Sequence, residues 1–491
     1  MRKFLTLILC ALFALPAARA DGPSAILTSF GSVGASANGA CIGTSPCAVT
    51  SLVDNAGNTW TLSASACDAG STPSCVWRNG SYAGFTSTVT IILWYSGTIY
   101  QYNGSQWFPC ATNCTSGSSA SVTWGAGQSD PRGSSFGIKV VNNTFTDLFN
   151  NVLQLQGIGI SGLEISYAPG MWDAYNNTTQ AQWTSIKTTW NINIIRLPLN
   201  EWAWRTNATS AGGTAYQTIV TNAVTRITAA GMYAILDLHW AAPASYNGYL
   251  GGRSITGYAD GQPGYLNQDY SAAFWTSVAN AYKSNPAVLF EIFNEPYGNN
   301  SGGSSSYTYL LNGSGSTSIT FYDQYAGSGS PTATSATFKA AGHQQMVTAI
   351  RGTGATNVIL WSSPVFNSQL ANSLAVRPTD TLTPSQLGAT IHYGGGSTTD
   401  YNNVLAANYP IVMTEFYQPL ITGASNNYTS YLQPHKVGYV MWGPQNYSGT
   451  STNNLASGSP GPQLTNTGAG PGSNIGAPWN FNSASVKWPP F

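Results

Sequence analysis

The chain has 491 residues, and 17 basic side chains balance 17 acidic ones, so its formal net charge is zero. Charged residues make up only 7% of the chain, against roughly a quarter in an average soluble domain. This balance argues against nucleic acid or an anionic membrane surface as a partner. A hydrophobic content of 42% excludes a disordered chain, and the length predicts more than one domain.

Residues 1–20 predict a secretory signal peptide. Arg2 and Lys3 form a positive start, an apolar run covers residues 4–15, and Ala18-Arg19-Ala20 supplies a small-residue cleavage site. The apolar run is too short to span a bilayer. We therefore expect a protein secreted to the extracellular space or the periplasm, with no membrane attachment after cleavage.

Six cysteines follow the predicted signal, and all of them lie before residue 115. An exported segment of this kind predicts a disulfide framework. Many connectivities are possible, and proximity favours the neighbouring pairs Cys41–Cys47, Cys67–Cys75 and Cys110–Cys114. Zinc is the weaker alternative, because the segment has no Cys-x-x-Cys motif and no histidine.

Residues 21–114 predict a small antiparallel β-module. Strand-like runs at residues 88–94, 98–102 and 105–108 are separated by the turns Ser96-Gly97 and Asn103-Gly104. Two roles stay open for this module, carbohydrate binding and a spacer. The stretch 115–138 is rich in glycine and serine and predicts a linker. Aromatic residues that could stack on sugar rings are Trp94, Tyr95, Tyr100, Tyr102 and Trp107.

Residues 139–491 predict a catalytic domain in which short apolar runs alternate with helical stretches. Continuous apolar runs suit parallel strands that are covered on both faces, and eight such repeats predict a (β/α)8 TIM barrel. A doubly wound sheet is the alternative, but Gly157-Ile158-Gly159 lacks the rest of a dinucleotide-binding motif. Residues 443–491 predict an irregular tail whose aromatic residues could close the barrel floor. The eight runs cover residues 154–160, 193–199, 233–239, 288–294, 357–362, 387–393, 410–416 and 438–442, and the main helices 179–190, 214–230, 271–283 and 335–352.

Polar residues gather at the carboxyl ends of these runs, where barrel enzymes place their chemistry. Strand alternation puts residues 291, 293 and 295 on one face, with Asp237 and Glu291 one layer below the mouth. Because a buried carboxylate needs a partner, Arg196 is the candidate cation. Two carboxylates at the mouth, Glu295 and Glu415, suit glycoside hydrolysis, which needs one carboxyl group to protonate the leaving oxygen and a second to attack or to activate water.

The ordered motifs resemble those of glycoside hydrolase family five over residues from about 139 to 450. This family consists of (β/α)8 enzymes that retain anomeric configuration, with glutamates on strands four and seven. Gly159–Glu164 is similar to the first-strand segment of the family. The matching motifs are Ile195-Arg196-Leu197-Pro198, Leu236-Asp237-Leu238-His239, Asn294-Glu295-Pro296, His392-Tyr393, Thr414-Glu415-Phe416 and Trp442.

The resemblance implies that Glu295 is the acid/base and Glu415 the nucleophile. A cation beside Glu415 favours its ionised form, and an ionised Glu415 in turn favours a protonated Glu295. Arg196 and Tyr393 would hold Glu415, Asn294 would contact the substrate 2-hydroxyl, and a tryptophan would form the stacking floor. The substrate-binding residues implied in this way are Asn294, Arg196, His239, His392, Tyr393 and Trp442.

The expected protein is thus a secreted retaining endoglycosidase, foremost an endo-β-1,4-glucanase acting on a neutral polysaccharide. A β-mannanase or a xyloglucan-type hydrolase is the alternative on the same site, and a catalytically inactive polysaccharide-binding barrel is the alternative of another class. We expect a monomer without an organic cofactor or a catalytic metal. A serine-hydrolase pattern at residues 133–137, around Ser135, lies in the linker without the required strand and helix, and we interpret it as chance.

Overall fold

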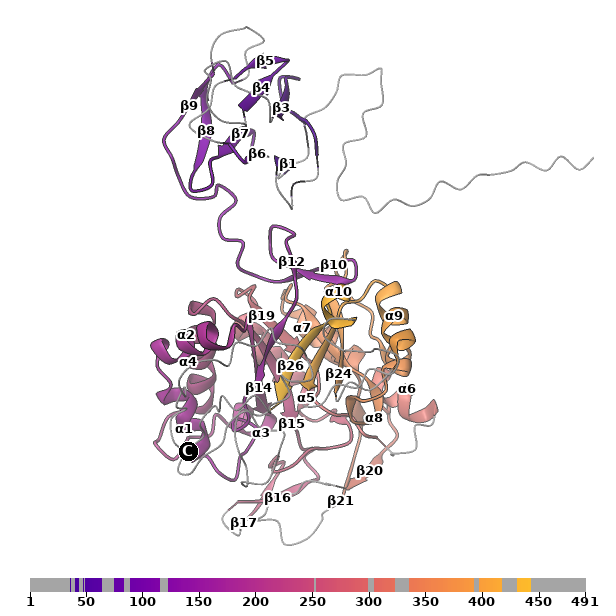
Figure 1. Ribbon diagram of the computed structural model, residues 1–491. Coiled ribbons are helices and arrows are strands. Elements are labelled where there is room, and N and C mark those ends of the chain that lie inside the picture. Colours follow the sequence, from indigo (N-terminus) through magenta and orange to yellow (C-terminus); the bar gives the residue numbers. More distant parts are fainter. Residues whose placement is uncertain are drawn as a thin grey trace, which may run out of the picture. The chain divides into compact units, whose positions relative to one another are not determined.

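A computed structural model describes most of the chain between residues 36 and 442 (Figure 1). The predicted signal peptide, Cys67, Tyr393 and the tail 443–491 lie outside the described residues. The chain divides into two compact units, residues 1–134 and 135–491. The described stretches are 36, 40–43, 47, 49–63, 75–83, 89–114, 122–250, 253–298, 304–322, 335–392, 397–416 and 431–442.

The first unit contains two antiparallel sheets, as expected for a small β-module. The expected disulfides Cys41–Cys47 and Cys110–Cys114 are both present. One sheet has the order β1 (Cys41–Gly43), β6 (Ile91–Tyr95), β7 (Thr98–Tyr102), β8 (Trp107–Thr112) and β9 (Thr123–Trp124). The other consists of β2 (Leu52–Val53), β3 (Thr59–Ser63), β4 (Cys75–Arg78) and β5 (Ser81–Tyr82).

Local sequence explains the central hairpin of this unit. Ser96 and Gly97 join β6 to β7 with φ angles of 48° and 79°, the left-handed pair that a two-residue hairpin turn requires. Strand β9 falls inside the stretch expected as a linker, because Trp124 pairs with Cys110 on β8. The first sheet therefore extends beyond the last cysteine.

The second unit is a closed barrel of eight parallel strands, which confirms the predicted (β/α)8 fold. Each of the eight apolar runs became one barrel strand. In barrel order these strands are β13 (Gln156–Gly159), β14 (Ile194–Asn200), β15 (Tyr233–Trp240), β19 (Val288–Glu291), β23 (Ile359–Ser362), β24 (Leu387–His392), β25 (Ile411–Phe416) and β26 (Gly438–Trp442).

Helices cover the outside of the barrel (Figure 1). Thr179 caps α2 with a capping box, as its position before a helical run suggests. The described helices are α1 (Gly170–Asn177), α2 (Gln180–Trp190), α3 (Glu201–Thr206), α4 (Tyr216–Ala229), α5 (Ser271–Tyr282), α6 (Ser304–Asn312), α7 (His343–Gly352), α8 (Pro364–Asn367), η1 (Leu370–Val376), α9 (Thr398–Ala406) and α10 (Gln433–His435).

The helix expected over residues 335–352 was too long. Residues Ser335–Phe338 form β21, which pairs with β20 (Ile319–Tyr322), and Ala340–Ala341 form β22, which pairs with β18 (Leu266–Asn267). The helix begins only at His343. Burial alternates along residues 336–340, as in a strand, and cross-strand pairing outweighed their helical propensity.

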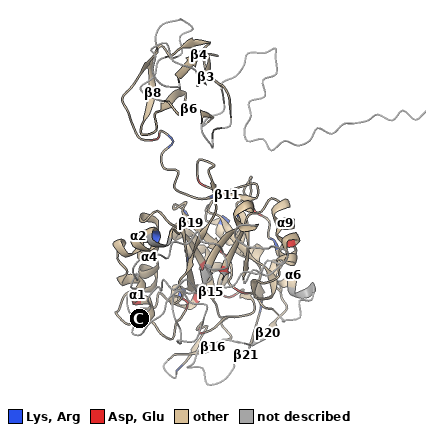
Figure 2. Ribbon diagram, viewed as in Figure 1, with Lys and Arg blue, Asp and Glu red and all other residues tan. Residues whose placement is uncertain are grey.

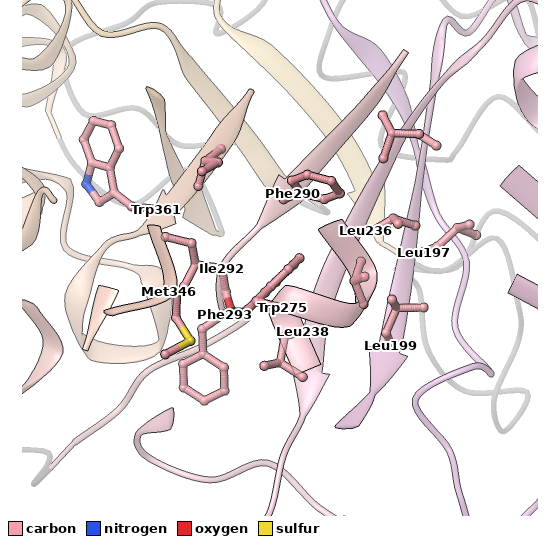
Figure 3. Packing of buried hydrophobic residues seen from close by; sticks show 14 of the residues in the cluster. Leu197, Leu199, Leu236, Leu238, Trp275, Phe290, Ile292, Phe293, Met346 and Trp361 are labelled. Atoms are coloured by element: carbon pink, nitrogen blue, oxygen red, sulfur yellow. Dashed lines mark hydrogen bonds between the residues drawn. The ribbon is translucent and has the colours of Figure 1, made fainter. Parts of the chain in front are cut away.

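Alternation along the barrel strands separates hydrophobic from ionisable side chains. Leu197, Leu199, Leu236 and Leu238 belong to the hydrophobic cluster that the strands share with α5 and α7 (Figure 3). The residues between them, such as Arg196 on β14, point into the barrel, where Arg196 reaches carboxylates on other strands. The strand period of two therefore collects charge inside a barrel that is apolar outside. Figure 2 shows how few charged residues the rest of the ribbon carries.

The amino ends of the barrel strands are covered by residues that precede the barrel. Strands β10 (Lys139–Val141), β11 (Thr144–Thr146) and β12 (Val152–Leu153) form a small sheet. Val140 and Phe145 from it pack with Ile194 and Val440 of the barrel. None of the helices in the described stretches is long and apolar enough to cross a membrane.

Candidate active site

Five barrel strands bring ionisable residues together toward the carboxyl end of the barrel. Glu295 follows β19, His392 ends β24 and Glu415 lies on β25. One side-chain ligand atom from each of these three buried residues lies within 4.8 Å of the other two. Two carboxylates that are 120 positions apart in the sequence therefore meet at one place.

Arg196 is fully buried and contacts residues from three other strands or their ends. Its Nε donates to Glu291 at 2.6 Å, and its Nη1 donates to Glu415 at 2.8 Å. Its Nη2 donates to Asn294 at 2.7 Å and lies 3.0 Å from Asp237. The planar fork of donors in a guanidinium explains how one cation serves four acceptors. One positive charge thus faces three carboxylates.

His239 and Asn294 are held in fixed orientations. The Nδ1 of His239 lies 2.6 Å from an Asp237 oxygen, and its Nε2 lies 3.2 Å from the Asn294 Nδ2. Burial lowers the pKa of His239 to about 4. The ring is therefore neutral, with Nδ1–H donating to Asp237 and Nε2 accepting from Asn294.

His392 belongs to a hydrogen-bond chain that determines where protons reside. Its Nδ1 lies 2.8 Å from Glu295 Oε1, and its Nε2 lies 3.2 Å from the Thr414 hydroxyl, which is 2.6 Å from Glu291. Burial lowers the pKa of His392, so the ring is neutral and its Nδ1–H donates to Glu295. The Thr414 hydroxyl donates to Glu291 Oε1 and lies beside the His392 Nε2. Burial raises the pKa of Glu291, and Arg196 opposes this shift.

The local backbone departs from regular strands where the site is built. Strand β19 ends at Glu291, so the expected alternation of 291, 293 and 295 does not hold. Phe293 joins the hydrophobic cluster instead (Figure 3), and the consecutive residues Asn294 and Glu295 both reach the site. The register of β25 shifts in a similar way between residues 413 and 416. Because bulges re-aim side chains, both Thr414 and Glu415 point inward.

The pKa values of the two glutamates shift in opposite directions. Burial, followed by repulsion from Glu295, raises the pKa of Glu415 well above its usual range, although Arg196 opposes this. Burial alone would raise the pKa of Glu295 too, but hydrogen bonds from His392 and Gln262 lower it. The pair therefore holds one proton nearer Glu415, whereas the sequence argument expected Glu415 to be ionised. The difference arises because burial and the nearby Glu295 outweigh the attraction of Arg196.

Sequence reasoning missed Gln262 and Thr414. Gln262 lies in the long loop after β15, and no strand-end signal marks it. Thr414 was quoted only as a neighbour of Glu415, although its hydroxyl joins His392 to Glu291. The predicted residue Tyr393 lies outside the described residues. For Trp442 the structure describes only the backbone, which ends β26 opposite Gly159.

Glu295, His392 and Glu415 have the spacing of a metal-ligand set, but their surroundings do not suit one. The Arg196 Nη1 lies 2.8 Å from Glu415 and would repel a divalent cation. His392 already directs its Nδ1 at Glu295. Two carboxylates and a shared proton are sufficient for acid/base and nucleophilic chemistry.

The chain resembles solved structures and matches one family description. No curated protein sequence matches the chain. The solved structures that it resembles include an endoglucanase catalytic domain from Thermobifida fusca, with 18% identity and a TM-score of 0.41, covering 66% of this chain and 90% of that one. A cellulase of glycoside hydrolase family 5 from an Icelandic hot spring isolate has 16% identity and a TM-score of 0.43, with coverages of 65% and 84%.

A β-glucanase from Saccharophagus degradans is similar to the same extent, with 16% identity, a TM-score of 0.40 and coverages of 65% and 87%. The family description that matches residues 150–448 is "Cellulase (glycosyl hydrolase family 5)". This match spans more than half of the chain and includes every strand of the barrel. The chain therefore belongs to glycosyl hydrolase family 5, the cellulase family, and is a glycoside hydrolase.

Proposed function

We propose that the protein is an endo-β-1,4-glucanase that retains anomeric configuration, with Glu295 as acid/base and Glu415 as nucleophile. The observation that carries the proposal is the approach of their carboxylates to within 4.8 Å. Retaining glycosidases place these groups about 5 Å apart, whereas inverting enzymes need several ångströms more for a water molecule. Membership in the cellulase family supports a β-glucan as substrate.

In the first step, a Glu415 oxygen attacks the anomeric carbon while Glu295 gives its proton to the departing glycosidic oxygen. The bond between the anomeric carbon and that oxygen breaks, and an ester to Glu415 forms. In the second step, ionised Glu295 takes a proton from water as the water oxygen attacks the same carbon and releases Glu415. The reaction starts from the arrangement with the pair's proton on Glu295, which exchanges with the arrangement on Glu415 across this short distance.

The surrounding residues have separate parts in this proposal. Arg196 aims Glu415 through the 2.8 Å bond to its carboxylate. Both hydrogens on the Asn294 Nδ2 have partners, His239 at 3.2 Å and Gln262 at 3.3 Å. The substrate 2-hydroxyl would share one of them. His239 and His392 would line the central subsite with Tyr393, and Trp442 would stack on the sugar.

A substrate panel tests the proposal. We expect hydrolysis of carboxymethyl cellulose and barley β-glucan, and early products with β configuration by proton NMR. Glu295→Gln and Glu415→Gln should each lose activity by orders of magnitude at an unchanged Tm. Hydrolysis of mannan or xyloglucan alone would establish the alternative substrate class. A chain that binds glucan without cleaving any polymer would be the inactive binding protein, and α product would contradict double displacement.

We further propose that the protein is secreted and that its first unit attaches it to insoluble polysaccharide. The aromatic face supports this role. Tyr95, Tyr100 and Tyr102 alternate on one face of β6 and β7 and are all partly exposed. Trp107 stacks on Tyr102 with a centroid distance of 4.8 Å. Aromatic rings with hydroxyl groups suit neutral sugars, which offer both apolar faces and hydrogen-bond partners.

Binding to microcrystalline cellulose tests the attachment role in the full chain. The Glu415→Gln background prevents release by hydrolysis. We expect the added triple variant Tyr95→Ala, Tyr100→Ala and Tyr102→Ala to remain largely in the supernatant, whereas Tyr82→Ala should sediment like its parent. Tyr82 is a matched control because it is 38% exposed on the other sheet of the same unit. Equal sedimentation of both variants would mean that the three tyrosines do not bind cellulose and that the first unit acts as a spacer.

A further inference from the structure

The long loop after β15 contributes one buried amide to the active site. This loop covers residues 241–270 and includes the hairpin of β16 (Asn247–Leu250) and β17 (Arg253–Thr256). Gln262 lies beyond the hairpin and is only 4% exposed. A buried amide must have its hydrogen bonds satisfied, so its contacts define its role.

Both ends of the Gln262 side chain contact residues of the site. Its Nε2 donates to the backbone oxygen of Glu295 at 2.9 Å and to the Glu295 carboxylate at 3.2 Å. Its Oε1 accepts from the Asn294 Nδ2 at 3.3 Å. The amide can adopt only this orientation, because a flipped amide would place its oxygen against two acceptors of Glu295.

The loop backbone around Gln262 is braced from two sides. The Tyr297 hydroxyl donates to the Gln262 backbone oxygen at 3.1 Å. Asp260 accepts from the Tyr246 hydroxyl at 2.7 Å and from the Tyr249 backbone N–H at 2.9 Å. These bonds tie the segment to the hairpin and to the residue two positions after Glu295. The backbone that carries Gln262 is therefore held by contacts that do not involve the Glu295 carboxylate.

We propose that Gln262 is a positioning residue for the acid/base, which fixes the rotamer of Glu295 and favours its ionised form. The inference rests on the function proposed above. His392 donates to one Glu295 oxygen and Gln262 donates to the other, so the carboxylate is held between the end of β24 and the loop after β15. This restraint matters most when Glu295 must deliver a proton along one direction, to a leaving oxygen that cannot depart as an anion. The same donation stabilises the carboxylate that acts as base in the second step.

Gln262→Met tests this role, because methionine has a similar length and lacks both polar atoms. Aryl cellobiosides separate proton delivery from the rest of the reaction. We expect hydrolysis of phenyl cellobioside to slow by about tenfold to a hundredfold, the range for a hydrogen bond to a charged group. Hydrolysis of 2,4-dinitrophenyl cellobioside, whose leaving group needs no proton, should slow far less. The acid limb of the pH–kcat/KM profile should move to higher pH, because ionised Glu295 loses a donor.

Two further variants complete the test. Gln268→Met is the control, since the Gln268 Nε2 also donates two hydrogen bonds, but to the backbone oxygens of Gly315 and Ala340 and not to a carboxylate of the site. It should keep the wild-type pH profile and leaving-group dependence. Gln262→Glu is nearly isosteric and donates only when protonated, so its activity toward phenyl cellobioside should recover as the pH falls. This rescue is measurable even if Gln262→Met fails to fold.

The outcomes distinguish this inference from the function on which it rests. If Gln262→Met slows the hydrolysis of both cellobiosides equally and leaves the pH profile unchanged, Gln262 only stabilises the fold. If Gln262→Met keeps wild-type rates, the hydrogen bond from Gln262 to Glu295 does not contribute to catalysis. Either result overturns the inference while Glu295→Gln remains inactive. A wild-type chain that cleaves no cellobioside, or a fully active Glu295→Gln, would overturn the proposed function as well.

Discussion

Arg196 determines the charge balance of the barrel interior. It is one buried cation among Asp237, Glu291 and Glu415, and Glu295 adds a fourth carboxylate nearby. Four buried negative charges against one positive charge would be very costly, so some of these carboxylates carry protons. Burial raises the pKa of Asp237 to about 7, even with Arg196 opposing the shift. The buried carboxylates of the site are therefore held in position by Arg196, and some of them are protonated.

Glu291→Gln tests whether Glu291 needs a negative charge. Burial raises the pKa of Glu291 and so favours its neutral form, and a glutamine can still accept from the Arg196 Nε as Glu291 does. We expect this variant to keep a near-wild-type Tm and most of its activity on β-glucan, whereas Glu291→Leu should lose several kcal/mol of stability because Arg196 then lacks a buried partner. If Glu291→Gln is as damaging as Glu291→Leu, the negative charge of Glu291 beside Arg196 is required.

Glu201 should make stability depend on pH. Burial raises its pKa to about 7 from 4.5, although Ser271, Asn267 and the Ala242 N–H donate to it. A raised carboxyl pKa stabilises the fold fully below pH 4.5, and this contribution is lost as the pH rises through about 7. In chemical denaturation, the free energy of unfolding of the wild type should fall by up to about 3 kcal/mol because of Glu201 as the pH rises from 4.5 to above 7. Glu201→Gln should lack this part of the fall. An identical pH dependence in the variant and the wild type would contradict this.

At the residue scale, chemical type and position at a strand end were enough to single out Arg196, His239, Asn294 and His392, all of which lie in the network around the two glutamates. The proton distribution could not be obtained from the sequence. It depends on how many carboxylates share Arg196 and on which nitrogen of His392 faces Glu295, and both follow from three-dimensional contacts.

Strands and loops contribute differently to the site. Buried parallel strands leave a strong sequence signal because both of their faces are apolar, and all eight were predicted. The β15–α5 loop leaves no such signal. Its hairpin, and the turn that presents Gln262, are held by side-chain hydrogen bonds to Asp260. A similar limit explains the misassigned start of α7, where β22 pairs with β18, a strand distant in sequence.

Asp260→Asn tests the brace in this loop. An asparagine can still accept from the Tyr246 hydroxyl but presents its NH2 group to the Tyr249 N–H, which then loses its acceptor. We expect a stability loss of about 1–3 kcal/mol by chemical denaturation, together with slower hydrolysis of phenyl cellobioside as Gln262 loses support. Tyr246→Phe, which removes one hydrogen bond without a mismatch, should cost less. Equal stability of Asp260→Asn and the wild type would show that the hydrogen bonds of Asp260 do not stabilise the loop.

At the scale of the whole molecule, the two units are stabilised by different means. The first unit has little chain with which to build a core and contains disulfides. The barrel unit has no cysteine, since the last one in the sequence is Cys114, and it relies on a large continuous hydrophobic cluster. The composition predicted this division, whereas the membership of Thr123–Trp124 in the first sheet required the structure.

Differential scanning calorimetry with and without reductant tests this division. We expect two transitions, because the units are compact in themselves. Dithiothreitol should lower the transition of the first unit, which loses its cross-links, and should leave the barrel transition and the hydrolysis of soluble β-glucan unchanged. A parallel shift of both transitions would indicate that the units unfold as one cooperative body.

The central claim is that Glu295 and Glu415 act on one glycosidic bond by double displacement. Trapping the covalent intermediate tests it most directly. After incubation with 2,4-dinitrophenyl 2-deoxy-2-fluoro-β-cellobioside, peptide mass spectrometry should find one fluorocellobiosyl group, attached to Glu415. Attachment to another residue, or turnover of β-glucan to α product without any labelled peptide, would contradict the account.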